Sequence, residues 1–539
     1  MQRQSKKMWF TILGLALGTL VGIYIQPLIS GDSIYEQLNK FKDVLFTVEK
    51  YYVDDVNSPE LVESAIAGML NRLDPHSVYI PAEQQRRVEE DFRGSFEGIG
   101  IEFDVIRDTI TVVSPISGGP SETLGIISGD KIIKIDGQNA VGMDRSDVPN
   151  KLRGKKGTTV NVTIVRAGGT DPLEFTITRD KIPLYTVVAS FVEENGTGYM
   201  KINQFADPTY TEMMQHLEKL SEKGMKRLIL DLRGNPGGYL ERAVRMADEF
   251  IGGTHKIVYT KSTRSDEEEV FRAHGGQSYE DIPLIILVSP GSASASEIMA
   301  GAVQDLDRGL VVGETTFGKG LVQKAFPLSD GSAFRLTVAR YYTPSGRLIQ
   351  RPYENGRESY YALEGRDGGE EGANIDHTND ARDTSKPTFK TVGGRKVIGG
   401  GGITPDYIVK PDTLNSTSGS WEIITKNIIW EFVEAYMGSS GSALREQYGN
   451  NFDDFLNGFQ VTPGMFDSFL KMAEAKEIKV DRELIREDAP LLKNRIKARI
   501  ARSIWGDNEF YRIALQSDKQ YQKALTLFPE ALKIAALAK

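Results

Sequence analysis

Residues 283–306 of the chain read P-L-I-I-L-V-S-P-G-S-A-S-A-S-E-I-M-A-G-A-V-Q-D-L. The stretch opens with a continuous apolar run over 283–289, which is typical of a strand buried on both faces. It passes through a glycine turn into apolar side chains at helical spacing, among them Ile298, Met299 and Ala302. A second apolar run, RLILDL at 227–232, is followed in the same way. The repeated strand–turn–helix pattern predicts an α/β domain.

Composition shifts on either side of this pattern divide the 539 residues, which are too many for a single core. We assign residues 183–411 to the α/β domain and regard 352–400, a polar and glycine-rich stretch, as a mobile insertion within it. Residues 95–182 alternate short apolar runs with glycine turns, which predicts a compact β-rich module. Residues 32–94 and 412–539 have helical patterns, so we expect a helical N-terminal region and a helical C-terminal domain.

The N-terminus resembles a membrane anchor. Arg3, Lys6 and Lys7 precede an uncharged stretch that is strongly apolar over 8–25. The stretch approaches the ~20 residues that span a bilayer and has no clear small-residue cleavage site. Residues 1–31 are therefore predicted to be an uncleaved anchor, with a cleaved signal or a buried helix as alternatives. The basic flank should stay in the cytoplasm, which would place the chain after residue 32 outside it.

Charge and cysteine content exclude several functions. A net charge of -9 argues against a general nucleic-acid binder. The absence of cysteine removes thiol nucleophiles, disulfides and thiolate metal sites. One segment is locally basic and amphipathic, and we interpret it as a solvated helix face, with binding to an acidic partner as the alternative. Its basic residues are Lys493, Arg495, Lys497, Arg499 and Arg502.

Small hydroxyl residues stand at the turn between the strand at 283–289 and the helix that follows. A serine at a helix N-terminus lies beside free N–H groups and the positive end of the helix dipole, which would stabilise an oxyanion. Ser294 and Glu297 have capping-box spacing. On this segment alone, the interpretation that Ser292, Ser294 and Ser296 are only helix caps is favoured.

A lysine in a glycine turn, Lys319, follows Ser294 by 25 residues within G-E-T-T-F-G-K-G. The turn is one residue short of a Walker A loop, has Gly320 where Ser or Thr is needed, and precedes an extended stretch rather than a helix. The alternative to a solvated lysine is a neutral amine that acts as general base for a serine. None of the five histidines has a setting typical of a catalytic base, although sequence alone leaves a Ser-His-Asp triad open.

Several segments together resemble the carboxyl-terminal processing proteases, also called tail-specific proteases. The resemblance covers roughly residues 35–410 and leaves out the C-terminal 125 residues and the insertion. Its motifs are G-S-A-S-A-S-E-I at 291–298, F-G-K-G-x-V-Q at 317–323, L-D-L-R-G-N-P-G-G at 230–238, L-D-P-H-S at 73–77, G-I-T-P-D at 402–406 and G-I-G-I at 98–101.

The resemblance implies a crotonase/ClpP-like α/β protease core with an inserted PDZ domain. It implies a serine endopeptidase with a Ser-Lys dyad that cleaves proteins near or from their C-termini and needs no cofactor or metal. Ser294 matches the nucleophile, Lys319 the general base and Gln323 the residue that orients the lysine. Ala295 with Gly237 or Gly238 would form the oxyanion hole. Asp305 matches a possible supporting acid, with a purely structural role as the alternative.

The implied PDZ domain would bind substrate C-termini, and the residues that match its carboxylate loop are Gly98, Ile99, Gly100 and Ile101. Arg153 is a candidate sensor of the bound tail, with an ordinary surface arginine as the alternative. Expected partners are protein or peptide substrates and the membrane, with a homo-oligomer or an adaptor possible and no nucleic acid. The expected location is the bacterial cell envelope, anchored in the inner membrane with the catalytic domains in the periplasm or otherwise outside the cytoplasm. The competing functions are a PDZ scaffold with a dead protease domain and an ATPase or other enzyme on the α/β domain.

Overall fold

The computed structural model describes residues 34–537 except 167–170, 265–267, 355, 363–369, 376, 378–385, 413 and 415–416. The predicted anchor over residues 1–31 lies outside the described residues. Among the residues that are described, no helix is long and apolar enough to cross a membrane. The chain divides into two compact units, one ending at Tyr79 and the other beginning at Ile80. In the first unit the described helices are α2 (Ile34–Tyr51) and α3 (Ser58–Leu70).

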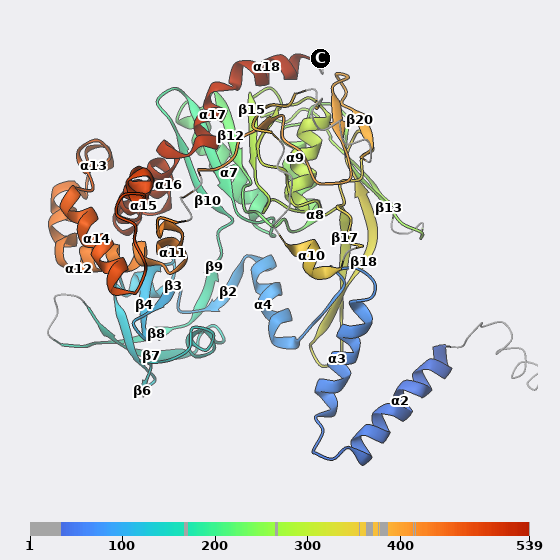
Figure 1. Ribbon diagram of the computed structural model, residues 1–539, viewed down its shortest axis with the longest axis horizontal. Helices are drawn as coiled ribbons and strands as arrows, with labels where there is room; N and C mark the ends of the chain where they lie inside the picture. Colours follow the sequence, from blue (N-terminus) through green and yellow to red (C-terminus); the bar gives the residue numbers. More distant parts are fainter. Residues whose placement is uncertain are drawn as a thin grey trace, which may run out of the picture. The chain divides into compact units, whose positions relative to one another are not determined.

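A mostly parallel sheet forms the centre of the second unit (Figure 1). The strands β12 and β15 are the two predicted apolar runs, and they pair in parallel. Both are buried on both faces because helices cover each side of the sheet. The order across the sheet is β10 (Val187–Val192), β11 (Thr197–Ile202), β12 (Arg227–Asp231), β15 (Leu284–Val288), β16 (Leu310–Gly313), β22 (Tyr407–Ile408) and β19 (Gly372–Ala373).

Two groups of helices cover the two faces of this sheet. One face packs on α7 (Thr209–Glu222), α8 (Leu240–Asp248) and α9 (Ala295–Asp305). The opposite face packs on α17 (Lys519–Thr526) and α18 (Phe528–Leu537), which lie over the strands in Figure 1. The last helices of the chain therefore complete the core of the α/β domain.

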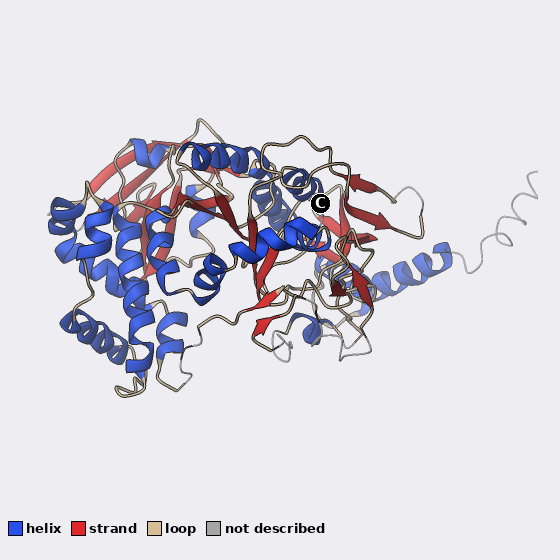
Figure 2. Cartoon of the chain, turned by 90° about the horizontal axis from the view of Figure 1, so that it is seen from above, coloured by secondary structure: helices blue, strands red, loops and turns tan. Residues whose placement is uncertain are grey.

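The predicted C-terminal helical domain, 412–539, consequently divides into two parts. Its first six helices share an apolar cluster of their own and gather at the left of Figure 1. Figure 2 shows the same region from above. From Leu515 onward the chain belongs to the sheet. The six helices are α11 (Ser420–Thr425), α12 (Ile428–Tyr448), α13 (Phe452–Gly458), α14 (Pro463–Ala475), α15 (Ile485–Ile504) and α16 (Asp507–Ala514).

The basic segment of this domain is not the solvated face that its composition predicts. Of its five basic residues only Arg495 is exposed. Lys497 donates to the carbonyl of Leu456 at 2.6 Å, and Arg499 lies over the Trp430 ring. Arg502 pairs with Asp507 and also reaches Glu102 of the β-rich module. Acidic and aromatic groups of the same chain thus cover most of the segment.

The β-rich module contains a five-strand path with one further hairpin strand. Between β5 and β6 the predicted turn at Asp136 and Gly137 has positive φ at both residues, 47° and 75°, as a tight hairpin requires. Strand β3 is at the edge of the path, and β2 (Ser95–Gly98) pairs separately with β9 (Asp180–Pro183). The path runs β3 (Ile101–Ile106), β4 (Thr109–Pro115), β5 (Lys131–Ile135), β7 (Thr159–Val165) and β8 (Leu173–Thr178), with β6 (Gln138–Asn139) beside β5 and the short helices α5 (Pro120–Thr123) and α6 (Val148–Leu152).

A second sheet carries the strands that follow the predicted catalytic lysine. It contains β13 (Lys256–Lys261), β14 (Val270–Arg272), β17 (Leu321–Pro327) and β18 (Ala333–Tyr342). Strands β17 and β18 form a long antiparallel hairpin.

The sequence predicts that the insertion at 352–400 is mobile, but its described part is anchored. Besides β19 of the central sheet, it contains α10 (Arg357–Tyr361), β20 (Thr388–Lys390) and β21 (Lys396–Ile398). Next to β21, Arg395 is buried and pairs with Asp307 and Asp406 at 2.7 Å each. These two carboxylates come from the α/β domain, so the buried ion pairs fasten the insertion to it.

Candidate active site

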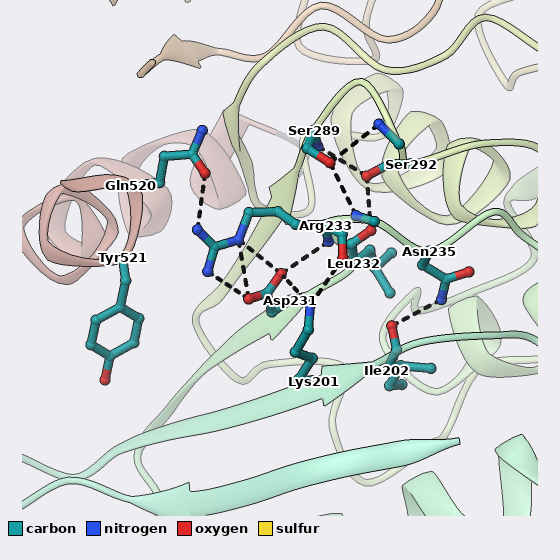
Figure 3. Close-up of polar contacts among 12 residues, drawn as sticks. Lys201, Ile202, Asp231, Leu232, Arg233, Asn235, Ser289, Ser292, Gln520 and Tyr521 are labelled. Atoms are coloured by element: carbon teal, nitrogen blue, oxygen red, sulfur yellow. Dashed lines mark hydrogen bonds and ion pairs between the residues drawn. The ribbon is translucent and has the colours of Figure 1, made fainter. Parts of the chain in front are cut away.

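Ser294 lies at the turn between β15 and α9 in a conformation that few residues other than glycine adopt, with φ 54° and ψ -110°. The two neighbouring serines have different roles. Ser292 is buried and donates to the carbonyl of Leu232 at 2.8 Å (Figure 3), and the buried Ser296 donates to the carbonyl of Asn235 at 2.9 Å. Ser294 is half-buried, so of the three it is the one with access to solvent. Burial thus separates a candidate nucleophile from two serines that hold the loop.

Glu297, in the first turn of α9, joins the loop of Ser294 to the loop of Lys319. Its Oε2 accepts the backbone N–H of Ser294 and the backbone N–H of Lys319, each at 2.8 Å. Its Oε1 accepts the hydroxyl of Thr316 at 2.5 Å and the N–H of Gly318 at 2.7 Å. Complete burial raises the pKa of Glu297 to about 7, against the opposing effect of these hydrogen bonds. Sequence spacing indicated only a helix cap here.

Lys319 follows β16 in a glycine turn and is half-buried. Its Nζ donates to Oε1 of Gln323, in β17, at 2.8 Å. Tyr341 of β18 is buried, and its hydroxyl lies within hydrogen-bonding distance of two carbonyl oxygens, that of Ser294 at 3.1 Å and that of Lys319. The structure therefore brings the predicted serine, lysine and glutamine loops together, and Tyr341 adds a contact that the sequence did not indicate.

Of the two glycines predicted for the oxyanion hole, Gly237 lies against the candidate nucleophile, whereas Gly238 lies against the backbone of Phe205. A Cβ on Gly237 would stand 2.8 Å from the backbone nitrogen of Ala295 and 2.8 Å from Cβ of Ser294. Only glycine fits this approach, and the φ of 100° also favours it. The N–H of Gly237 already donates to Oδ1 of Asn235 at 2.8 Å. The N–H of Gly237 is therefore already engaged within its own loop.

Asp305 lies at the other end of α9 and is buried among structural partners. Its Oδ1 pairs with Arg347 at 2.6 Å, and its Oδ2 accepts the N–H and hydroxyl of Ser345 at 3.0 and 2.6 Å. These contacts fix the turn after β18. They favour the structural role for Asp305.

The two alternative chemistries have weaker support in the fold. Lys319 is followed by strand β17 and not by the helix that a phosphate-binding loop requires. His216 contacts Ser190 at 2.6 Å and His274 contacts Asp248 at 2.7 Å, so both have partners other than Ser294.

The predicted carboxylate loop of the β-rich module joins β2 to the edge strand β3. Gly100 has φ 74°, and the carbonyl of Ile99 accepts two hydrogen bonds from Ser121. Arg153 lies at the end of α6, half-buried over the ring of Phe96. Its guanidinium pairs with Glu90 of helix α4 (Ala82–Arg93) at 2.5 Å. Both line a cavity of about 1270 Å³ between α4 and the module.

Comparison with known proteins identifies several of the regions described above. Residues 196–354 match peptidase family S41 and residues 98–178 match the PDZ domain. Residues 26–84 match the N-terminal domain of the activating protease CtpB, and residues 421–506 match a family of unknown function.

Individual relatives match this chain over most of their own length. The chain is 37% identical over 351 residues to the carboxy-terminal-processing protease of Bartonella bacilliformis, covering 64% of this chain and 80% of that protein. It is 36% identical over 361 residues to the carboxy-terminal processing protease CtpA of Bacillus subtilis, covering 65% and 76%. The solved photosystem II D1 C-terminal processing protease is 30% identical and covers 57% of this chain and 89% of its own, with a TM-score of 0.32.

The fold and these matches define a serine-type peptidase that carries a PDZ domain. The chain belongs to the carboxy-terminal processing proteases of peptidase family S41. The β-rich module is its PDZ domain, and the α/β domain is its peptidase core.

Proposed function

We propose that Ser294 is the nucleophile and Lys319 the general base of this protease. The observation that carries the proposal is the shared carboxylate oxygen of Glu297, which accepts the backbone N–H of both residues at 2.8 Å. The two backbone nitrogens can therefore be no farther apart than twice that distance. Nζ of Lys319 can approach the hydroxyl of Ser294 because an extended lysine side chain is longer than this distance between the two backbone nitrogens.

In the proposed reaction Oγ of Ser294 attacks the scissile carbonyl carbon while its proton moves to the neutral Nζ of Lys319. The carbonyl oxygen becomes an oxyanion, which the N–H groups of Ala295 and Gly238 stabilise. The C–N bond then breaks, and the lysine ammonium gives its proton to the departing amine. Water next attacks the acyl-serine ester, Nζ takes a proton from that water, and the proton returns to Oγ as the acid product leaves.

Gln323 has an orienting role in this proposal. Because its Oε1 accepts one N–H of Lys319, it limits the directions in which Nζ can point. Tyr341 supports the same geometry, since one hydroxyl contacts the backbone carbonyls of both catalytic candidates. Neither residue needs to exchange a proton with the substrate.

The PDZ domain is proposed to select substrates by their C-termini. An extended tail would add to the edge strand β3, with its carboxylate at the loop of Gly98, Ile99, Gly100 and Ile101. Arg153 is the proposed sensor, because its pairing with Glu90 ties the module to α4 and lies beside a large cavity. A bound tail that drew Arg153 away would release this connection.

The proposal also covers where the protease is located in the cell and whether it assembles with other chains. The basic flank and apolar stretch of residues 1–31 support an inner-membrane anchor with the peptidase in the periplasm. Fractionation of cells that produce the full chain tests this, because recovery in the soluble fraction would contradict an uncleaved anchor. A homo-oligomer or an adaptor remains a prediction, which sedimentation velocity of the purified protein with and without substrate would check.

A fluorophosphonate probe tests the assignment of Ser294. The probe should add one phosphonyl group to the wild-type chain, and peptide mapping should place it on Ser294. Labelling should disappear in Lys319→Ala, because the serine then lacks its base. Labelling of another residue, or undiminished labelling of the lysine variant, would overturn the assignment.

A further inference from the structure

Arg233, in the motif that contains the candidate oxyanion glycines, is held from two sides (Figure 3). On one side its Nη2 and Nε contact Asp231 at the end of β12, at 2.7 and 3.0 Å. On the other side its Nη1 donates to Asp518 at 2.7 Å and to Gln520 at 2.9 Å. Asp518 and Gln520 begin α17, which lies far outside the stretch 196–354 that matches the peptidase family.

The charges explain why a second carboxylate is needed. Asp231 is buried and already contacts Lys201, at 3.5 Å, as well as Arg233. Burial would raise the pKa of Asp231, but the two neighbouring cations outweigh burial and hold the pKa below its usual range. Without Asp518, one carboxylate would face two cations in a largely water-free site. Asp518 supplies the missing negative charge.

The loop that follows Arg233 is bonded to the loop of the candidate nucleophile. The carbonyl of Asn235 accepts the N–H of Ala293 at 3.0 Å and the hydroxyl of Ser296 at 2.9 Å. The side chain of Asn235 accepts the N–H of Gly237 and donates to the carbonyl of Ile202. A shift of Arg233 would therefore be passed to the oxyanion glycines through a short loop that is bonded along its length.

The C-terminal partners of Arg233 are themselves fixed. Asp518 caps α17 by accepting the N–H of Tyr521 at 2.9 Å. Gln520 is buried and donates to the carbonyl of Val409 at 2.7 Å. Tyr521 and Phe528 are buried against the sheet. The contact to Arg233 thus starts from a helix that is itself anchored to the sheet.

We infer that Asp518 and Gln520 are positioning residues for catalysis, which act through Arg233 to hold the loop that carries Gly237 and Gly238. The inference rests on the proposed active site. It gives the C-terminal helices a catalytic purpose in addition to covering the sheet, because the oxyanion loop is complete only when α17 is docked.

The variant Asp518→Asn tests this inference with little change in shape. Asparagine retains an oxygen for the N–H of Tyr521 and remains a good helix cap. Its amide nitrogen then faces Nη1 of Arg233, and because both groups are hydrogen-bond donors, the hydrogen bond from Arg233 is lost. We expect kcat for a fluorogenic peptide to fall about tenfold while KM stays within about twofold, because the loss acts on the oxyanion. Lys519→Ala, whose side chain is exposed on the same helix, is the matched control and should retain wild-type kcat.

A second measurement separates positioning from mere folding. A peptide aldehyde forms a tetrahedral adduct with the serine and should lose affinity in step with kcat. Active sites are counted by fluorophosphonate titration, so that rates refer to folded protein only. Gln520→Met, which removes the other acceptor, should show the same pattern with a smaller loss and serves if Asp518→Asn does not fold.

Wild-type kcat per titrated site in both variants would overturn the inference, as would a fall in melting temperature with unchanged kcat and aldehyde affinity. The proposed active site has its own test in Ser294→Ala. Full activity of that variant would refute the dyad, whereas an inactive Ser294→Ala beside a normal Asp518→Asn would refute the positioning role alone.

Discussion

Replacement of Glu297 by glutamine should reduce kcat/KM without unfolding the protein. The carboxylate accepts four hydrogen bonds, and all four partners are donors. Glutamine has one accepting oxygen and places an NH₂ group where the other oxygen was.

The structure limits how well glutamine can adapt. If its oxygen serves Ser294 and Lys319, its NH₂ faces Thr316, whose hydroxyl can rotate, and Gly318, whose N–H cannot. At least one buried donor is then unpaired, at a cost of about 1–3 kcal/mol. Since the unpaired group lies in the lysine turn, we expect roughly a five- to 150-fold loss in kcat/KM.

The assay is cleavage of a fluorogenic peptide at pH 8, with rates normalised to the concentration of folded protein. Glu241→Gln, on an exposed face of α8, controls for the loss of one carboxylate. A Glu297→Gln enzyme within about twofold of wild type would refute the reasoning, because a mismatch of about 1 kcal/mol would exceed that change.

The pH dependence of stability gives an independent check on the same residue. An ordinary glutamate titrates near 4.5, whereas burial raises the pKa of Glu297 to about 7. Between these values the folded protein retains a proton that the unfolded chain has lost, so stability falls as pH rises through this window. The contribution amounts to roughly 3 kcal/mol. The melting temperature of wild type should therefore fall relative to that of Glu297→Gln from about pH 4.5 to 7. If melting temperature varied with pH in parallel for the two proteins, the raised pKa of Glu297 would be contradicted.

Three further outcomes follow from contacts described above. Ser294→Ala and Lys319→Ala should each abolish cleavage of a casein-type substrate, and the double variant should be hardly worse than either. Lys319→Arg should be equally inactive because a guanidinium stays protonated. Substantial turnover by Ser294→Ala would exclude Ser294 as the nucleophile. Substrates with an amidated C-terminus should be cleaved roughly ten- to a hundred-fold more slowly than the free acids, and Arg153→Ala should weaken this difference; equal kcat/KM for the two forms would show that the PDZ domain does not read the carboxylate. Arg395→Ala should destabilise the protein by about 3–5 kcal/mol, because Asp307 and Asp406 lose a buried partner; an unchanged denaturation midpoint would show that the insertion is not anchored there.

Local patterns predicted the elements that carry the catalytic candidates. The continuous apolar runs at 227–232 and 283–289 became adjacent parallel strands, because such runs are stable only when helices cover both faces. The turn at Asp136 and Gly137 formed as expected. The serine motif located the strand-to-helix turn. The sequence could not show which of its serines is accessible, because Ser292 and Ser294 differ in burial, and burial depends on the tertiary packing.

Contacts between residues distant in sequence could not be predicted. Glu297 has capping-box spacing, and nothing in that spacing indicates that its second role joins a loop some twenty residues farther along. Arg233 and Asp518 are 285 residues apart, and each alone would pass for an ordinary charged surface residue. Arg395 lies in a polar, glycine-rich stretch, so composition indicated mobility where buried ion pairs give order.

The covering of the peptidase sheet by α17 and α18 has a consequence for the order of events during protein synthesis. These helices leave the ribosome well after the two catalytic candidates, yet they pack on one face of the catalytic sheet. Until they emerge, Ile229, Ile285 and Leu287 have no cover on that face, and the domain cannot complete its core. A nascent chain that already contains Ser294 and Lys319 but lacks these helices is therefore expected to be inactive.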